Sequence, residues 1–334
     1  MNVNRSTPPP ANPGLALFAK LVVAATFALI FIGGHTTTSG AGMAFPDWPL
    51  SNGSLNPDGW WTNFMMRLEH GHRLTAGLVA TSVAVLLGCV WVARDRVPRG
   101  ALAVATCALL GVLAQAVLGG LRVIFDPQGT AAVNSTTATV FRVLHGCCAQ
   151  IELCLLVALA AMLSPAWRRI SANPALAGVR GLGKVVVGFV FLQLIFGATM
   201  RHLGAGLAIP TFPQATSDGR WMPRVHNMFV DLNFTHTRFG ALVVTVLAIA
   251  LAVRAFRLSG GEVLIVRPAL LLLALLVAQV TLGMFVIWNT RPPMLTTLHV
   301  VNGAALLATA LLLTLRAGRS ASLASVASIE EVAA

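Results

Sequence analysis

The sequence predicts an all-α integral membrane protein in which eight transmembrane helices form two tandem, pseudo-symmetric four-helix bundles. The first observation is composition: 56% of the 334 residues are hydrophobic and only 10% are charged, and the mean hydropathy is +0.79. Such a chain is too apolar for a soluble domain. The second is the number of apolar stretches, and the third is an internal repeat of 164 residues.

The apolar stretches have the length that membrane helices need. Crossing a hydrocarbon core of about 30 Å takes roughly 20 mostly apolar residues. Eight stretches qualify, and they run from Leu15 to Gly34, Leu74 to Val92, Leu102 to Ile124, Val140 to Leu163, Lys184 to Met200, Phe229 to Val253, Pro268 to Trp288 and Leu295 to Leu315. The first lacks a small-x-small cleavage pattern, so we interpret it as a membrane helix and not as a signal peptide.

These stretches divide the chain into two halves with short ends. We expect residues 1–13 to be a flexible, proline-rich N-terminus, residues 14–171 to form the N-terminal half, residues 172–318 the C-terminal half, and residues 319–334 a flexible tail. All five cysteines fall inside predicted helices, so we expect no disulfide in the loops.

The distribution of basic residues predicts the orientation. Fourteen of the 23 Lys and Arg residues lie in the two ends of the chain and in the loops after the second, fourth and sixth helices. Because short cytoplasmic loops carry the excess of positive charge, we expect a multi-pass protein of the cytoplasmic membrane with both termini inside. The net charge of +12 is then a topology signal. No basic stripe accompanies aromatic platforms, so we expect no nucleic-acid partner.

The internal repeat keeps one offset over more than seventy residues. The segment 40–49 aligns without a gap on 204–213, and the same offset relates His72 to His236, Gln115 to Gln279 and Leu118-Gly119 to Leu282-Gly283. A constant offset across several landmarks indicates duplicated units. Because each unit has an even number of helices, both halves enter the membrane in the same direction.

Four histidines fall at corresponding places in these units. The second, fourth, sixth and eighth helices all start outside, and each carries a histidine near its start: His72, His145, His236 and His299. Ionisable groups in membrane helices are costly and usually functional. Two imidazoles from facing helices can ligate heme iron inside a four-helix bundle. We therefore predict heme-iron sites toward the outer face; the alternative is that each histidine hydrogen-bonds a neighbouring helix.

Four arginines are predicted on the extracytoplasmic side, where the positive-inside preference disfavours them. They are Arg73, Arg142, Arg201 and Arg238, all close to the histidines or to the glycine-containing loops. Heme carries two propionates, and arginine pairs with carboxylates in bidentate geometry. These residues are accordingly candidates for cofactor binding, with interfacial snorkelling as the alternative.

Together these residues resemble the heme A synthase family over nearly the whole chain. The resemblance rests on the four histidines and on motifs at Gly33-Gly34, Trp48-Pro49-Leu50, Glu69-x-x-His72-Arg73, Gln115-x-x-Leu-Gly and Gln279-x-x-Leu-Gly. It implies oxidation of the heme O methyl group to the formyl group of heme A, for an aa3-type terminal oxidase. It also implies heme b in the C-terminal half and the substrate, heme O, in the N-terminal half. The expected partners are heme O and membrane lipid, with a heme O synthase, an electron donor and a homo-oligomer left open.

The chain departs from the family at three positions. Many bacterial relatives carry two cysteines in the first outer loop, where this chain has Ala44 and Ser51. A basic residue that is frequent in the first glycine loop is replaced by Thr37. A thiol–disulfide step is therefore not expected here.

The two halves differ where a proton or a charge matters. Glu69 aligns with Asn233, and it shares a helix face with His72 three residues later. A carboxylate there can accept protons or stabilise positive charge during C–H oxidation. We therefore predict that Glu69, His72 and His145 are catalytic and that His236 and His299 hold a permanent heme. The alternative for Glu69 is a carboxylate favoured by a helix N-terminus.

Two other functions fit the same residues. One is a diheme cytochrome b that relays electrons, and the other is a non-enzymatic protein that handles or transports heme. The difference between Glu69 and Asn233 favours the synthase, because matched residues would be expected from two equivalent hemes.

Overall fold

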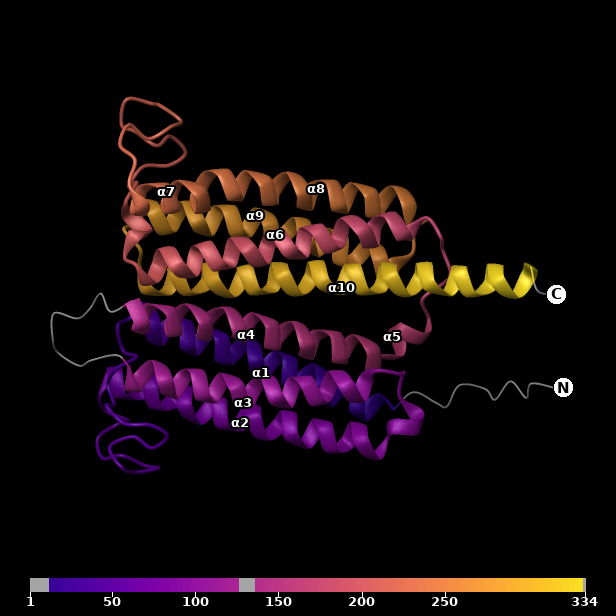
Figure 1. Cartoon of the computed structure of the whole chain (residues 1–334), viewed down its shortest axis with the longest axis horizontal. Helices are drawn as coiled ribbons and strands as arrows, with labels where there is room; N and C mark the ends of the chain where they lie inside the picture. Colours follow the sequence, from indigo (N-terminus) through magenta and orange to yellow (C-terminus); the bar gives the residue numbers. More distant parts are fainter. Residues whose placement is uncertain (1–11, 126–135, 333–334) are drawn as a thin grey trace.

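The computed structural model describes residues 12–125 and 136–332, and most of that part of the chain is helical (Figure 1). The expected flexible start falls almost entirely on residues 1–11, which lie outside the described residues. The same is true of most of the long third loop of the first half. The N-terminal half consists of α1 (Pro13–Thr38), α2 (Phe64–Val92), α3 (Ala101–Ile124) and α4 (Thr136–Leu163).

The C-terminal half repeats this arrangement with one irregular helix. After a short α5 (Pro165–Arg168) come α6 (Leu176–His202), α7 (Met228–Phe234), α8 (Ala241–Leu258), α9 (Val263–Trp288) and α10 (Pro293–Val332). A π-helical segment, Thr235–Gly240, joins α7 to α8, so that Met228–Leu258 is one continuous span. In the described part of the chain, eight helices are long and apolar enough to cross a membrane, as predicted.

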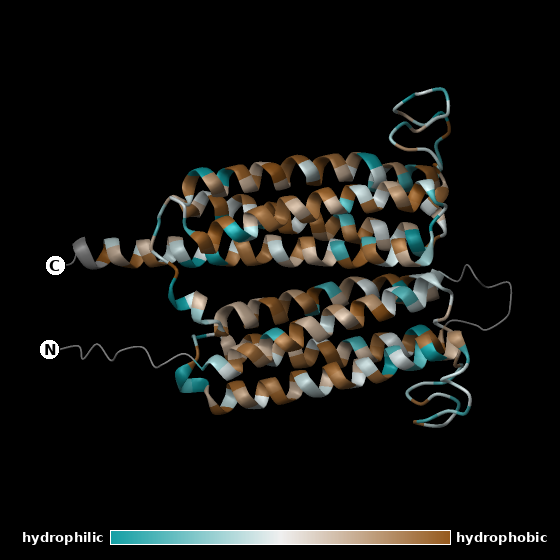
Figure 2. Cartoon of the chain, turned by 180° about the vertical axis from the view of Figure 1, so that it is seen from behind, coloured by the Kyte–Doolittle hydropathy of each residue, from teal (hydrophilic) through white to brown (hydrophobic). Residues whose placement is uncertain are grey.

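Each half closes into its own bundle. In each, consecutive membrane helices pack together and the last packs on the first. One apolar core lies among α1 to α4 and another among α6, α8, α9 and α10. The bundles meet through α1, α4, α6 and α10, where Leu153 packs with Ala304, Ala308, Phe27 and Ile30. Figure 2 shows that hydrophobic residues dominate the helices and that hydrophilic ones gather at helix ends and in loops.

Local signals at the loop boundaries recur with the 164-residue offset. Asn63 caps α2 by accepting hydrogen bonds from two backbone N–H groups, and Asn227 caps α7 in the same way. Gly40, just after α1, and Gly204, just after α6, have φ angles of 71° and 72°, which glycine adopts without strain. These shared signals support a duplication of the unit.

Two helix ends differ from the sequence expectation. The second span was expected from Leu74, but α2 begins at Phe64 because Asn63 supplies a cap, so His72 lies more than two turns inside the helix. The tail 319–334 was expected to be flexible, but α10 continues through it to Val332. Residues 319–334 contain alanine, leucine and glutamate and neither glycine nor proline, a composition that favours helix.

The arrangement places two loops at one end of the molecule. The 39–63 loop follows α1 and the 203–227 loop follows α6, and both lie at the end opposite the start of α1 and the end of α10 (Figure 1).

Candidate functional site

The structure brings the four predicted histidines together in two pairs. The ring centroids of His72 and His145 are 6.5 Å apart, and their planes are inclined by 87°. The corresponding values for His236 and His299 are 6.4 Å and 82°. Each pair joins two helices of one bundle, α2 with α4 and the α7–α8 span with α10. The two halves therefore hold their imidazoles in almost the same geometry.

This separation fits axial ligation of one iron atom. Two metal–nitrogen bonds of about 2 Å each, with about 1.1 Å more from each nitrogen to its ring centroid, place the centroids about 6.2 Å apart. Within residues 12–125 and 136–332, no group of three or more metal-binding side chains forms, so neither pair has a third such neighbour. A structural zinc site takes four protein ligands. Two imidazoles alone fit a heme better than a bare metal ion.

Glycines clear the space beside every one of these imidazoles. A Cβ atom at the glycine would lie 2.6 to 3.3 Å from Cε1 of the facing histidine, closer than ordinary van der Waals contact. The contacts are Gly33 with His72, Gly119 with His145, Gly197 with His236, and Gly283 with His299. In the sequence, Gly33, Gly119 and Gly283 stand out as motif residues, and the 164-residue offset relates Gly33 to Gly197.

The histidine of the α7–α8 span is held in a defined orientation. His236 Nδ1 donates to the carbonyl oxygen of Gln193, 3.1 Å away, and the Gln193 amide donates back to the His236 carbonyl at 2.5 Å. A proton on Nδ1 leaves Nε2 with its lone pair free for a metal. Gln193 was not predicted from the sequence.

The two glutamines that the 164-residue offset relates, Gln115 and Gln279, have different surroundings. Gln279 Nε2 lies 3.3 Å from His299 Nε2, and its oxygen accepts from Asn302 at 2.7 Å. Gln115, its counterpart in the N-terminal half, has both amide atoms buried without a hydrogen-bond partner. Counted from the paired histidines His145 and His299, Cys148 occupies the place of Asn302. The N-terminal half thus has a buried side-chain amide near its histidines whose hydrogen bonds are not formed.

Glu69 binds the 39–63 loop as well as lying near His72 in sequence. The side chain is buried; one carboxylate oxygen pairs with Arg73 at 2.6 Å and the other accepts from the backbone N–H of Phe45 at 3.0 Å. Its counterpart Asn233 instead donates to carbonyls of the 203–227 loop, those of Ala205 and Gly206. Both residues anchor a loop, but only Glu69 brings a carboxylate.

Arg73 is engaged with the same loop. Its guanidinium donates to the carbonyls of Asp47 at 2.8 Å and Leu50 at 2.5 Å, and it lies over the ring of Phe45 at 5.5 Å. These contacts give Arg73 a loop-anchoring role. Propionate binding by Arg73 stays a prediction.

Arg238 anchors the second loop through the equivalent atoms. It donates to the carbonyls of Thr211 at 2.5 Å and Gln214 at 2.9 Å, which correspond to Asp47 and Leu50 by the 164-residue offset. Arg238 itself is offset from Arg73 by 165 residues. The π-helical segment accommodates one extra residue, as such bulges do. The guanidinium of Arg238 therefore reaches the same two loop carbonyl positions as that of Arg73. Its predicted role toward propionates is likewise untested.

Other arginines gather at the loop ends of the two bundles. Arg201 donates to the Gly34 carbonyl across the boundary between the halves at 2.8 Å, and it lies within electrostatic range of Arg122 and Arg291. Arg142 lies within range of His202, beside Arg201. Arg122 and Arg291 were not predicted, although Arg122 lies near the loop end of α3 and Arg291 in the short turn after α9, against the same positive-inside preference that indicated the others.

The remaining residues of the 39–63 loop hold its shape. His70 forms a hydrogen bond of 3.0 Å with Ser51 and packs on Trp60. Burial opposes ionisation of Asp47, but N–H donors at the start of the following turn outweigh it and lower the pKa of this carboxyl. The loop is therefore tied to α2 at several points.

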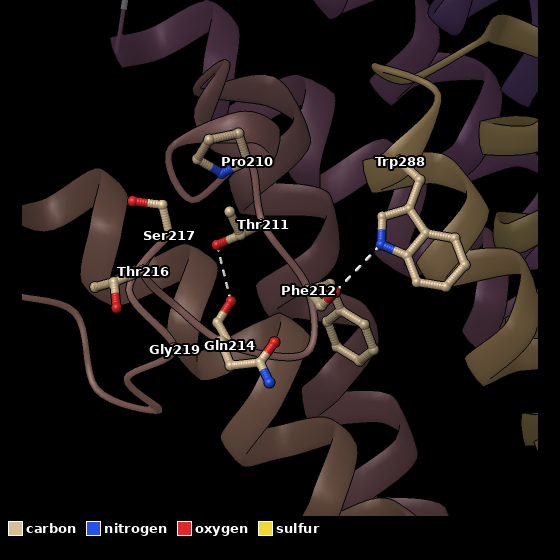
Figure 3. Close-up of a pocket in the computed structure, with 8 residues that line it drawn as sticks. All are labelled: Pro210, Thr211, Phe212, Gln214, Thr216, Ser217, Gly219 and Trp288. Carbon is tan, nitrogen blue, oxygen red and sulfur yellow. Dashed lines mark hydrogen bonds between the residues drawn. The ribbon is translucent and has the colours of Figure 1, made fainter.

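A surface hollow of about 580 Å³ lies on the 203–227 loop, and Figure 3 shows its lining. Thr211 donates to the Gln214 carbonyl across it, and Trp288 donates to the Phe212 carbonyl at 3.2 Å. None of the four paired histidines lines this hollow. It is a feature of the loop, separate from the histidine sites.

The fold and the sites define a class: a polytopic membrane protein with two bis-histidine sites, one in each four-helix bundle. A family model described as "Cytochrome oxidase assembly protein" matches residues 16–311. The chain belongs to this family, COX15-CtaA, which confirms the resemblance found in the sequence.

Several relatives carry the name "Heme A synthase". The one from Symbiobacterium thermophilum is 34% identical over 244 residues, covering 71% of this chain and 73% of the relative. Those from Beijerinckia indica and Azorhizobium caulinodans are 27% and 26% identical and cover 77% and 87% of this chain, and 80% and 90% of their own lengths.

Proposed function

We propose that this chain is a heme A synthase, an oxidoreductase that converts the methyl group of heme O into the formyl group of heme A for terminal-oxidase assembly. The observation that carries the proposal is the pair of bis-histidine sites in a chain of this family. Converting a methyl into a formyl group replaces two hydrogen atoms by one oxygen atom, supplied by water or O2, and oxidises the carbon by four electrons. Electrons must therefore pass to or from the substrate site, and a second site in the same molecule can carry them.

We assign the substrate to the N-terminal half and heme b to the C-terminal half. His72 and His145 would hold heme O, and His236 and His299 would hold heme b, which supplies an electron-transfer centre when bound. Two asymmetries support this. Among the residues that the structure describes, Glu69 places a carboxylate near the histidines of the N-terminal half where the C-terminal half has Asn233, and the side-chain amide of Gln115 lacks the hydrogen bonds that Gln279 makes. Glu69 can take up protons released during C–H oxidation.

The arginine cluster is the favoured place for the propionates. Arg142 and Arg201, both predicted, and the newly found Arg122 and Arg291 lie close enough to interact electrostatically with one another or with the neighbouring His202. Guanidinium groups bind carboxylates in bidentate geometry. Arg73 and Arg238 each donate to at least two loop carbonyls, whereas Arg201 donates to one, that of Gly34, so we expect Arg73 and Arg238 to contribute less than Arg201.

The proposed setting is the cytoplasmic membrane, with both termini inside and the sites toward the outer face. The excess of Lys and Arg at one end of the molecule supports this orientation. Heme O is the substrate partner and lipid the solvent. A heme O synthase and an electron donor are further proposed partners, and self-association is left to measurement.

Heme typing tests the function directly. Protein purified from cells without heme O is expected to contain heme b, and co-expression with a source of heme O is expected to add heme O and heme A. Pyridine hemochrome spectra and chromatography of extracted hemes distinguish the three. Heme b alone under both conditions would favour the diheme cytochrome, and no heme at all would refute both.

The charge of Glu69 is expected to matter for turnover and not for heme retention. Glu69→Gln keeps an acceptor for the Phe45 N–H but removes the carboxylate, so conversion should fall at least about a hundredfold, a typical loss for a general base. Heme b content should be unchanged. Asn233→Ala, the matching site in the other half, is the control and should retain conversion. If Glu69→Gln converts heme O at the wild-type rate, Glu69 only anchors the loop.

A further inference from the structure

A second buried carboxyl lies deeper in the N-terminal half. Glu152 follows His145 by seven residues on α4, which places it two turns and about 10 Å farther from the loop end, on the same helix face. Its side chain is 5% exposed, and neither carboxyl oxygen has a hydrogen-bond partner. The predicted mechanism does not use this group.

The carboxyl of Glu152 packs directly against α3. Its Oε2 lies so close to Gly111 that a Cβ atom at position 111 would displace the carboxyl from this place. In the C-terminal half the corresponding residues are Leu275 on α9 and Leu306 on α10, and both belong to one apolar core. A glycine and a glutamate thus replace two leucines at this level of the bundle.

The surroundings define the ligand that the carboxyl suits. An unpaired carboxylate is costly in the hydrocarbon region, so a lone carboxyl there is expected to be neutral until a partner arrives. A neutral carboxyl both donates and accepts one hydrogen bond, and so does an aliphatic hydroxyl. Charged groups such as propionates fit the arginine-rich loop end instead. The apolar depth of Glu152 therefore fits an uncharged hydroxyl on a lipophilic chain.

We propose that Glu152 binds the hydroxyl of the hydroxyethylfarnesyl group of heme O and so selects heme O over heme b at the N-terminal site. This inference rests on the proposed function, in which heme O occupies that half. Heme O carries its hydroxyl on the first carbon of the farnesyl-bearing substituent, where heme b has a vinyl group. The half assigned to heme b has leucines at the equivalent level, so the difference between the halves matches the difference between the hemes.

Gln115 extends the same polar strip toward the histidines. It lies one turn from Gly111 on α3, toward the loop end, and its amide atoms are unpartnered. Together, Glu152 and Gln115 give the N-terminal half a polar face that runs inward from His145. The C-terminal half has no equivalent polar face, because Asn302 forms a hydrogen bond with Gln279 and a leucine stands at the position that corresponds to Glu152.

A binding titration separates this role from catalysis. The full-length protein, with heme b retained in the C-terminal half as a reporter of folding, is titrated with heme O and with heme O whose hydroxyl is methylated. Soret absorbance gives the Kd of each. We expect wild type to bind heme O about tenfold more tightly than the methyl ether, the effect of one buried hydrogen bond. Glu152→Leu should bind the two equally, and Glu152→Gln should keep most of the preference.

The control lies on the same helix. Gln150→Leu also removes a buried polar side chain, but two residues away and so about 160° around the helix from Glu152, and it should keep the tenfold preference. Equal binding of both ligands by wild type, or an unchanged preference in Glu152→Leu, would overturn the proposal. If Glu152→Leu loses heme b and does not fold, the wild-type comparison alone decides. Failure of wild type to bind either ligand would instead refute the proposed function.

Discussion

Protein carrying His236→Ala is expected to be purified with at least about tenfold less heme b than wild type. His236 is one of only two imidazoles at its site, and even changes to residues that merely support a metal ligand cost about 10- to 100-fold in affinity. His72→Ala should instead retain heme b and lose binding of heme O. The ratio of heme to protein, measured by pyridine hemochrome, reports both results.

His226→Ala is the control for this pair of variants. His226 is an exposed loop histidine that contacts Asp231, and its replacement should leave both heme contents unchanged. Wild-type heme b in His236→Ala would show that the bis-histidine geometry serves packing alone. Loss of heme b in His72→Ala and not in His236→Ala would exchange the assignments of the two halves.

Valine in place of Gly197 is expected to remove heme b as completely as removal of the histidine does. The new Cβ would lie 2.6 Å from His236 Cε1 and would push the imidazole out of line with His299. Gly33→Val should act in the same way on His72, abolishing conversion of heme O while heme b is retained. Heme content and the low-spin absorption spectrum measure both effects.

Gly188→Val provides the matched control on α6. The site of its added side chain is open, with no atom within 4 Å of a Cβ, and the position is exposed. It carries the same change in helix propensity without the contact to a histidine. Equal heme loss in Gly188→Val and Gly197→Val would mean that the helix is disturbed and that the site is not blocked.

The sequence was sufficient for the eight spans and for the partners within each histidine pair. Hydrophobic length decides whether a segment crosses the membrane, and the constant offset carries the spacing of one half onto the other. The structure places both pairs at ligand distance, while their role as iron ligands stays a prediction.

The contacts that depend on tertiary packing could not be predicted in this way. Arg238 makes the loop contacts equivalent to those of Arg73 because the π-helical segment accommodates one extra residue, and a constant sequence offset does not reveal such a local adjustment. Glu152 is one acidic residue in an apolar stretch, and only its contact with Gly111 shows that it faces α3. The extension of α10 to Val332 does not follow from hydropathy, because hydropathy marks where the apolar span ends and does not report helix propensity.

The hydrogen bond from Arg201 to the Gly34 carbonyl has a consequence for communication between the sites. Gly34 follows Gly33, which packs on His72, and Arg201 lies one turn beyond Gly197, which packs on His236. A single peptide carbonyl thus joins the two helices that back the two imidazoles. We expect the two proposed heme sites to be coupled, so that binding of heme at either site restricts the motion of the helix behind the other histidine pair.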